Sequence, residues 1–194
     1  MDPGEENRLR RAQALECEAL AAIYDEYQPP IYRYVYRRLG HVDTARDVTS
    51  GVFQRLLAAF HDGNGPHSEL RAWLYRTAHN AVVDYYRRQQ HRQHLPVNEA
   101  LIDGDANPSQ DAERRILADD VRRALGKLTP DQQQVIALKF LEGLSNKEVA
   151  AVLDKSVGAV KSLQHRGQAA LRRHLTVEPR MRAAATPAAE ETVP

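Results

Sequence analysis

Hydrophobic residues recur along most of this chain at the three- and four-residue spacing that gives a helix one apolar face. The spacing predicts four helices between about residues 15 and 94 and four more between about residues 110 and 175. Pro29 and Pro30 are expected to end the first helix, and Gly40 is expected to end the second. Because glycine is sparse and runs of β-branched residues are nearly absent, we expect an all-α fold.

The stretch between the two groups of helices is polar and has proline near both of its ends, which is typical of a linker. We therefore expect two small helical bundle domains joined by a flexible linker. The predicted divisions are a flexible N-terminus at 1–14, a first helical domain at 15–94, the linker at 95–110, a second domain with a helix-turn-helix at 111–175, and a disordered tail, rich in Ala, Pro and Thr, at 176–194.

The second domain carries clear signals for where its helices begin. Thr129 precedes Pro130, and the glutamine two residues after that proline completes a capping box. Ser145 and Glu148 form a second capping box, and Gly143 separates the two helices. A turn at 154–156 then leads from a short helix into a longer one. This order of elements is that of a helix-turn-helix that reads duplex DNA.

Charge supports the same interpretation. From Ser145 to Leu175 there are six basic residues and two acidic ones. The exposed face of the last helix is predicted to be small and basic, so it could approach phosphates and base edges closely. An ordinary solvated helix face is the alternative, and the surrounding motif favours DNA. The candidate residues for duplex DNA are Lys155, Ser156, Gly158, Lys161, Ser162, His165 and Arg166.

The fourth helix, from about Ser68 to Arg92, interleaves aromatic and cationic residues on one face. Unpaired bases can stack on aromatic rings while guanidinium groups hold the phosphates, so this surface suits single-stranded nucleic acid. A tyrosine packed on a neighbouring helix beside surface arginines would give the same pattern, and the helix alone does not decide between the two. The candidates on this helix are Trp73, Arg76, His79, Asn80, Tyr86 and Arg87.

Several other functions are excluded by composition. No apolar stretch is long enough to span a membrane, so we expect no direct membrane insertion. The single cysteine, Cys17, permits no internal disulfide and indicates a reducing, cytoplasmic location. The histidines do not combine with carboxylates or cysteine at metal-ligand spacing, and no nucleophile turn or glycine-rich phosphate loop is present. We therefore expect no metal, no cofactor and no enzymatic activity.

Segments in both predicted domains resemble one family. DTARDVTSGVF at 43–53 and LRAWLYRTAHNAVVDYYRR at 70–88 match the first conserved domain of the extracytoplasmic-function (ECF) sigma factors, in the sigma-70 family. Residues 128–175 resemble the second conserved domain of that family, and the two matches occur in the family's order. The resemblance covers roughly residues 24–175 and implies a subunit that binds core RNA polymerase and directs promoter recognition, melting of the −10 element and transcription initiation.

The resemblance also implies a role for each surface. The first domain would dock on the clamp of the largest polymerase subunit and capture the −10 element as single strand, with the loop at 61–67 covering a flipped base. The second domain would read the −35 element as duplex and contact the flap of the second-largest subunit. An anti-sigma factor is a further expected partner. The implied clamp residues are Asp43, Asp47, Ser50, Phe53 and Gln54, and Asn64 and His67 join the −10 candidates given above.

The chain departs from the family pattern at particular positions. Arg46, Ser50 and Gly51 stand where the pattern has Glu, Gln and Glu, and Leu163 and Gln164 replace a basic residue and a leucine in the last helix. Two other functions would fit parts of the sequence. A stand-alone helix-turn-helix transcriptional regulator would need only the second domain, and a sigma-derived interaction module would need no contact with polymerase.

Overall fold

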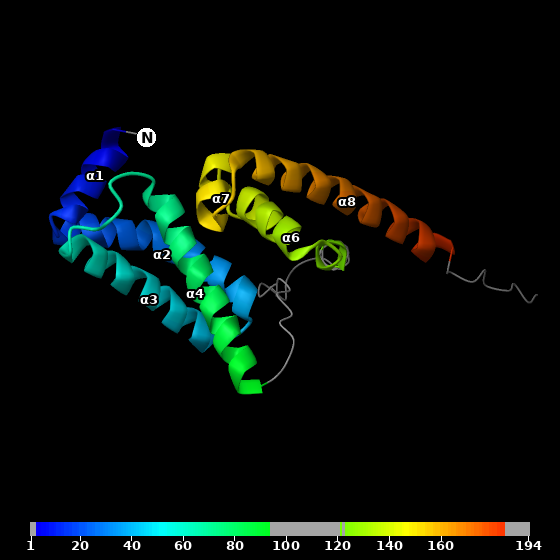
Figure 1. Cartoon of the computed structure of the whole chain (residues 1–194), viewed down its shortest axis with the longest axis horizontal. Coiled ribbons are helices and arrows are strands. Elements are labelled where there is room, and N and C mark those ends of the chain that lie inside the picture. Colours follow the sequence, from blue (N-terminus) through cyan, green and yellow to red (C-terminus); the bar gives the residue numbers. More distant parts are fainter. Residues whose placement is uncertain (1–2, 94–120, 122, 185–194) are drawn as a thin grey trace, which may run out of the picture.

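A computed structural model of the chain describes residues 3–93, 121 and 123–184, and in these residues every regular element is a helix (Figure 1). The prediction of an all-α fold is confirmed. The elements are α1 (Pro3–Gln13), α2 (Cys17–Leu39), α3 (Val42–His61), α4 (Leu70–Gln93), α6 (Pro130–Ile136), the π-helix η1 (Ala137–Leu141), α7 (Asn146–Leu153) and α8 (Val157–Ala184). The predicted linker, residues 95–110, lies outside the described residues.

Helices α1 to α4 form the N-terminal domain, in which α2, α3 and α4 pack pairwise against one another. Each helix contributes one apolar face to a common core, as the spacing of hydrophobic residues predicted. The fully buried side chains of this core include Ile23, Ile31, Val52, Leu74 and Val82.

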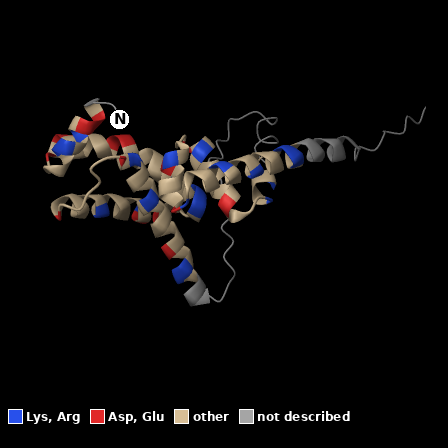
Figure 2. Cartoon of the chain, turned by 45° about the horizontal axis from the view of Figure 1, so that its top comes forward, with Lys and Arg blue, Asp and Glu red and all other residues tan. Residues whose placement is uncertain are grey.

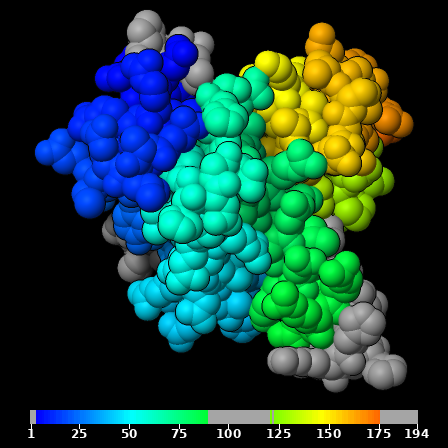
Figure 3. Space-filling model, turned by 60° about the vertical axis from the view of Figure 1, so that its left-hand side comes forward, coloured from blue at the N-terminus to red at the C-terminus, as the bar shows by residue number. Residues whose placement is uncertain are grey.

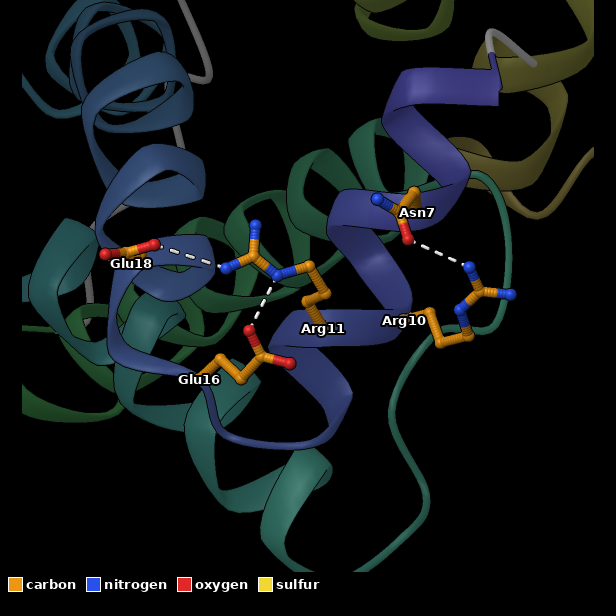
Figure 4. Close-up of polar contacts among 5 residues, drawn as sticks. All are labelled: Asn7, Arg10, Arg11, Glu16 and Glu18. Carbon is orange, nitrogen blue, oxygen red and sulfur yellow. Dashed lines mark hydrogen bonds and ion pairs between the residues drawn. The ribbon is translucent and has the colours of Figure 1, made fainter.

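The first helix, α1, corrects the prediction of a flexible N-terminus at 1–14. Leu9 and Ala12 on α1 are only 2% and 0% exposed, so the helix is anchored in the domain core. The turn into α2 is held by Arg11, which donates to Glu16 at 2.6 Å and to Glu18 at 3.2 Å (Figure 4). Hydrophobic spacing does not indicate this helix, because its remaining surface is polar.

Helix α2 passes through Pro29 and Pro30, so the prediction that these prolines end a helix is wrong. A proline in a helix interior removes a backbone hydrogen bond and costs about 3 kcal/mol. Tyr27, Ile31 and Tyr34, on either side of the prolines, are all buried on the same face of α2. Burial of this continuous apolar face outweighs the local cost, because each large side chain contributes roughly 1.5–3 kcal/mol.

The beginning of α3 and the end of α8 also differ from prediction. Asp43 does not cap α3: the N-cap residue is His41, and Asp43 lies in the first turn. Helix α8 is described as far as Ala184, beyond the predicted domain end at residue 175, and residues 185–194 lie outside the described part of the chain.

The C-terminal domain confirms the predicted helix signals. Thr129 and Gln132 form one capping box, and Ser145 and Glu148 form the other. The hydroxyl of Ser156 accepts from the backbone amide of Ala159 at 3.1 Å and caps α8. Helices α6 and α7 both pack on α8, which completes the helix-turn-helix.

The two domains pack directly on each other through α4 and α7 (Figure 3). One hydrophobic cluster includes Leu74 and Val82 of the N-terminal domain together with Val135 and Val149 of the C-terminal domain. The sequence predicted the two bundles but not this contact between them.

Candidate nucleic-acid interfaces

The first candidate interface is the exposed face of α8. Val160, Gly167 and Ala170 are buried on the opposite face of this helix. At Gly167, α8 lies so close to α6 that a Cβ would be only 3.1 Å from the Ile136 side chain. This packing fixes which face of α8 points outward. The outward residues are Ser156, Gly158, Lys161, Ser162, His165 and Arg166, all exposed and all among the predicted duplex-DNA set.

Lys155, the remaining predicted residue of that set, lies in the turn before α8. Its ammonium group is 3.0 Å from a carboxylate oxygen of Asp131 on α6, and its side chain is 29% exposed. Lys155 is therefore partly engaged within the domain, whereas Lys161 and Arg166 project from α8. Figure 2 shows basic residues in bands along α8.

A groove of about 740 Å³ flanks this face and was missed by the sequence reasoning. Basic residues from two elements line it: Lys127 before α6, and His165, Arg166 and Arg173 on α8. Lys127 is distant from α8 in the sequence, so only the fold brings these charges together. A groove of this sign suits an anionic polymer such as a nucleic-acid backbone.

The second candidate interface is α4, where the predicted residues separate into two groups. Arg76, Asn80 and Arg87 are exposed. Trp73, His79 and Tyr86 are partly buried, and Trp73 and Tyr86 pack against the core. The aromatic and cationic residues therefore do not form one open face along the helix.

His79 and Tyr86 are engaged with α2. The Tyr34 hydroxyl lies 3.1 Å from Nδ1 of His79, and the Tyr86 hydroxyl donates to the carbonyl oxygen of Arg38. Burial, and secondarily the nearby Arg38 charge, lower the pKa of His79 to about 4. The imidazole is therefore neutral at physiological pH. His79 and Tyr86 therefore pack on a neighbouring helix, which was the alternative interpretation of the aromatic and basic pattern on α4.

The loop before α4 carries Asn64 and His67, which are both exposed. Its backbone turns tightly at Gly63, where φ is +68°, and Gly65 lies so close to Phe60 that a Cβ would be 2.3 Å from the ring. Gln13 at the end of α1 supports the loop: its amide nitrogen donates to the carbonyl oxygen of Pro66 at 2.9 Å and lies 3.2 Å from Nδ1 of His67. Sequence reasoning missed this contact because it joins segments more than fifty residues apart.

The predicted clamp-docking residues lie on α3. Asp43, Asp47, Ser50 and Gln54 are exposed at the spacing of one helix face. Phe53 is only 6% exposed, and its ring meets that of Tyr24 edge-on with 4.9 Å between centroids. Tyr24 and Leu57 supply the exposed apolar surface beside this face, at 46% and 45% exposure.

Among the described residues, no group of three or more His, Cys, Asp and Glu side chains could hold a metal ion. Within the same residues, no helix combines the length and hydropathy needed to cross a membrane.

Comparison with known proteins gives matches to both domains. Sigma-70 region 2 matches residues 23–92, and Sigma-70, region 4 matches residues 118–171. The ECF RNA polymerase sigma factor SigW of Bacillus subtilis is 30% identical over 178 residues, which cover 87% of this chain and 95% of SigW. The ECF RNA polymerase sigma factor BldN of Streptomyces coelicolor is 36% identical over 173 residues, but the chain spans only 64% of the length of BldN.

Solved structures agree with the sequence relatives. CnrH, solved in complex with the cytosolic domain of CnrY, superposes with a TM-score of 0.64 at 26% identity, covering 89% of this chain and 97% of CnrH. The sigma factor RpoE of Bartonella quintana has the same fold, with a TM-score of 0.62 at 22% identity. Both domains are matched in order by the same proteins, which favours a sigma factor over a stand-alone regulator. The chain belongs to the sigma-70 family of RNA polymerase sigma factors and, within it, to the ECF group.

Proposed function

We propose that this chain binds core RNA polymerase and directs it to promoters. One domain would bind promoter DNA as duplex, and the other would bind the melted single strand of the same promoter. The observation that carries the proposal is the presence of two separate exposed polar surfaces, one on each matched family region. The α8 surface is suited to duplex DNA, and the exposed part of α4 with its preceding loop is suited to unpaired strand.

The α8 surface would read the −35 element. A helix-turn-helix places the first turns of its second helix in the major groove, where small residues allow close approach to base edges. Gly158 and Ser162 keep this part of α8 slim, and Lys161 and Arg166 project from the same exposed face. The basic groove with Lys127 would add phosphate contacts, which raise affinity without reading sequence.

The α4 surface would hold the −10 element after melting. Arg76, Asn80 and Arg87 are positioned to hold a strand along the helix, and Asn64 and His67 in the loop would cover a flipped base. Flipping one base costs a few kcal/mol, so a preformed pocket would contribute directly to melting. His79 and Tyr86 would act by fixing α4 on α2, and Trp73 would serve as a partly exposed stacking surface.

Partner proteins would use other faces. The clamp of the largest polymerase subunit would dock on α3 at Asp43, Asp47, Ser50 and Gln54, with Tyr24 and Leu57 adding apolar contact next to Phe53. The flap of the second-largest subunit would meet the C-terminal domain. We also propose an anti-sigma partner. This is supported by CnrH, which was solved in complex with the cytosolic domain of CnrY. The chain would act in the cytoplasm as an initiation factor, without catalysing a reaction itself.

A gel-shift experiment tests the proposal against a stand-alone regulator. Labelled promoter fragments are incubated with the chain, with bacterial core polymerase, or with both. The proposal predicts a stable, sequence-specific complex only when both are present. A specific complex of equal affinity formed by the chain without polymerase would instead support the regulator, and failure to associate with polymerase would support an interaction module.

A further inference from the structure

The loop between α3 and α4, residues 62–69, is held from both of its ends and passes beside α1 (Figure 1). Its first half is fixed by the end of α3, where the amide of Asn64 donates to the carbonyl oxygen of Ala59 at 2.9 Å. Gly65 and Pro66, in the middle of the loop, are buried. Loops usually run over the surface, so this one is unusual in having its middle packed into the domain.

The second half of the loop is held by Gln13, the last residue of α1. Its amide nitrogen donates to the carbonyl oxygen of Pro66 at 2.9 Å and lies 3.2 Å from Nδ1 of His67. A side-chain amide nitrogen carries two hydrogens, so it can serve both groups at once. One half-buried side chain thus fixes the backbone at Pro66 and the ring of the neighbouring His67.

Helix α1 is fixed on the rest of the domain, so Gln13 acts from a rigid base. Leu9 and Ala12 are buried in the domain core, and Arg8 pairs with Glu26 of α2 at 2.6 Å. The ion pair is partly exposed and contributes little, so burial of Leu9 supplies most of the anchoring. The position of Gln13 is therefore set by packing and does not depend on the loop.

The turn that follows Gln13 has a backbone conformation that leucine rarely adopts. Leu15 has a φ of +60°, in the left-handed region that disfavours residues with a Cβ. Its side chain is 42% exposed, so packing of the leucine does not compensate for this conformation. Strain of this kind persists where the surrounding structure requires one geometry, and it is often found at functional sites. Here the turn closes α1 directly after the residue that holds the loop.

We propose that Gln13 is a positioning residue for the −10 strand, which orders the loop in the free chain so that a flipped base meets Asn64 and His67 in place. The proposal rests on the proposed function, which assigns these two exposed loop residues to the −10 element. A loop that is ordered before binding loses less conformational entropy on binding, so affinity rises. Gln13 lies before residues 23–92, the stretch matched by Sigma-70 region 2, so this support comes from the chain's own first helix.

Amide hydrogen exchange in the free, full-length chain tests the anchor without DNA or polymerase. Gln13→Ala removes both contacts, and Gln13→Glu keeps the size of the side chain but places an acceptor against the carbonyl oxygen of Pro66. Each variant is expected to raise the exchange rates of the loop amides about threefold to tenfold, because exchange in a folded chain requires local opening. Amides within α1 should keep their rates, since Leu9 and Ala12 still anchor the helix.

Asn7→Ala is the matched control for hydrogen exchange, because Asn7 is an exposed residue of α1 that accepts a hydrogen bond from Arg10 on the same helix. It is expected to leave the loop rates unchanged. If loop exchange is unchanged in both Gln13 variants, the proposal is overturned. An equal rise in α1 and in the loop would mean general loosening of the domain, and it would overturn the positioning role as well.

The role in recognition is tested with holoenzyme and single-stranded −10 oligonucleotides that each lack one base. The position whose removal most weakens binding of the unchanged chain identifies the flipped base. Gln13→Ala is expected to weaken binding of the intact strand about threefold to tenfold, but binding of the strand without that base by less than about twofold, because the two changes act on one contact. Equal weakening of both strands would show a general effect on the fold and would overturn the role in recognition.

The anchor and the proposed function fail in different experiments. If holoenzyme with the unchanged chain binds intact and abasic strands equally at every position, the −10 function of the loop is contradicted, and hydrogen exchange still decides whether Gln13 holds the loop. If exchange rises in the Gln13 variants while the intact strand is bound as tightly as before, the loop is anchored by Gln13 but its positioning role for the −10 strand is overturned.

Discussion

His79 illustrates how a single residue can serve the fold where its sequence position suggests contact with DNA. It sits on the helix proposed to hold the −10 strand, but its ring nitrogen meets Tyr34 and its side chain is largely buried. The buried, neutral imidazole joins α2 to α4. We therefore expect His79 to support the −10 surface by positioning α4, and not by contacting DNA.

The lowered pKa of His79 makes the stability of the chain sensitive to acid. The pKa is about 4 in the folded chain against 6.5 ordinarily, so the unfolded chain binds the proton more readily between these values. Stability is then fully present above pH 6.5 and falls as the pH drops toward 4, by on the order of 1–3 kcal/mol. Urea unfolding at several pH values measures this loss, and His79→Gln is expected to flatten it. An equally steep acid loss in the variant would contradict this role.

Gln13 is predicted to position the loop before α4. Gln13→Ala removes the contacts to Pro66 and His67, and a hydrogen bond of this kind is worth about 0.5–1.5 kcal/mol. We expect holoenzyme made with this variant to bind a single-stranded −10 oligonucleotide roughly threefold to tenfold more weakly by fluorescence anisotropy. Asn7→Ala is the control, because Asn7 lies on the same helix and contacts Arg10 (Figure 4). Equal affinities for the two variants would show that the loop does not depend on Gln13.

At the scale of single elements, α8 is predicted to separate DNA affinity from polymerase binding. Lys161→Ala removes an exposed cation from the proposed −35 face, so duplex binding by the holoenzyme should weaken and its logarithmic salt slope should decrease by about 1. Binding to core polymerase should be unchanged. Arg10→Ala removes an equal charge from α1 and should alter neither quantity. A loss of core binding in Lys161→Ala would place this residue in the wrong interface.

Helix α2 gives a prediction about stability. Pro29 is exposed within the helix, so Pro29→Ala restores a backbone donor and removes little packing. The gain is reduced by the greater freedom of the unfolded chain, which leaves an expected stabilisation of about 1–2 kcal/mol. Chemical denaturation measures it. A destabilised variant would mean that α2 requires the bend that proline imposes.

The elements also show what the sequence can and cannot predict. The capping boxes at Thr129 and Ser145 were found because their hydrogen bonds are local, within three residues. The end of a helix at Pro29 was mispredicted because the energy that carries α2 through it comes from burial against distant helices. Helix α1 was missed because Leu9 and Ala12 are the only buried apolar residues that the structure describes on it. Local signals such as capping boxes can be recognised in the sequence. Where a local signal conflicts with burial against distant helices, as at Pro29, burial decides the structure.

For the whole molecule, the sequence predicted two bundles and the family but not how the bundles meet. Glu142 lies between a helix end and a glycine, where a carboxylate in the sequence looks solvated. Its burial depends on Arg37 and Tyr75, which lie more than sixty residues away. No periodicity or motif reports a contact of that kind. The packing of Glu142 against the N-terminal domain is thus a property of the assembled molecule alone.

Run-off transcription with purified bacterial core polymerase and genomic DNA fragments tests the central claim most directly. The account predicts discrete transcripts that require the chain and that start just downstream of paired −35 and −10 elements. Core polymerase alone, or core polymerase with the Lys161→Ala variant at limiting concentration, should give little or none of these products. If the chain never supports initiation from any template while it binds core polymerase normally, the account is contradicted.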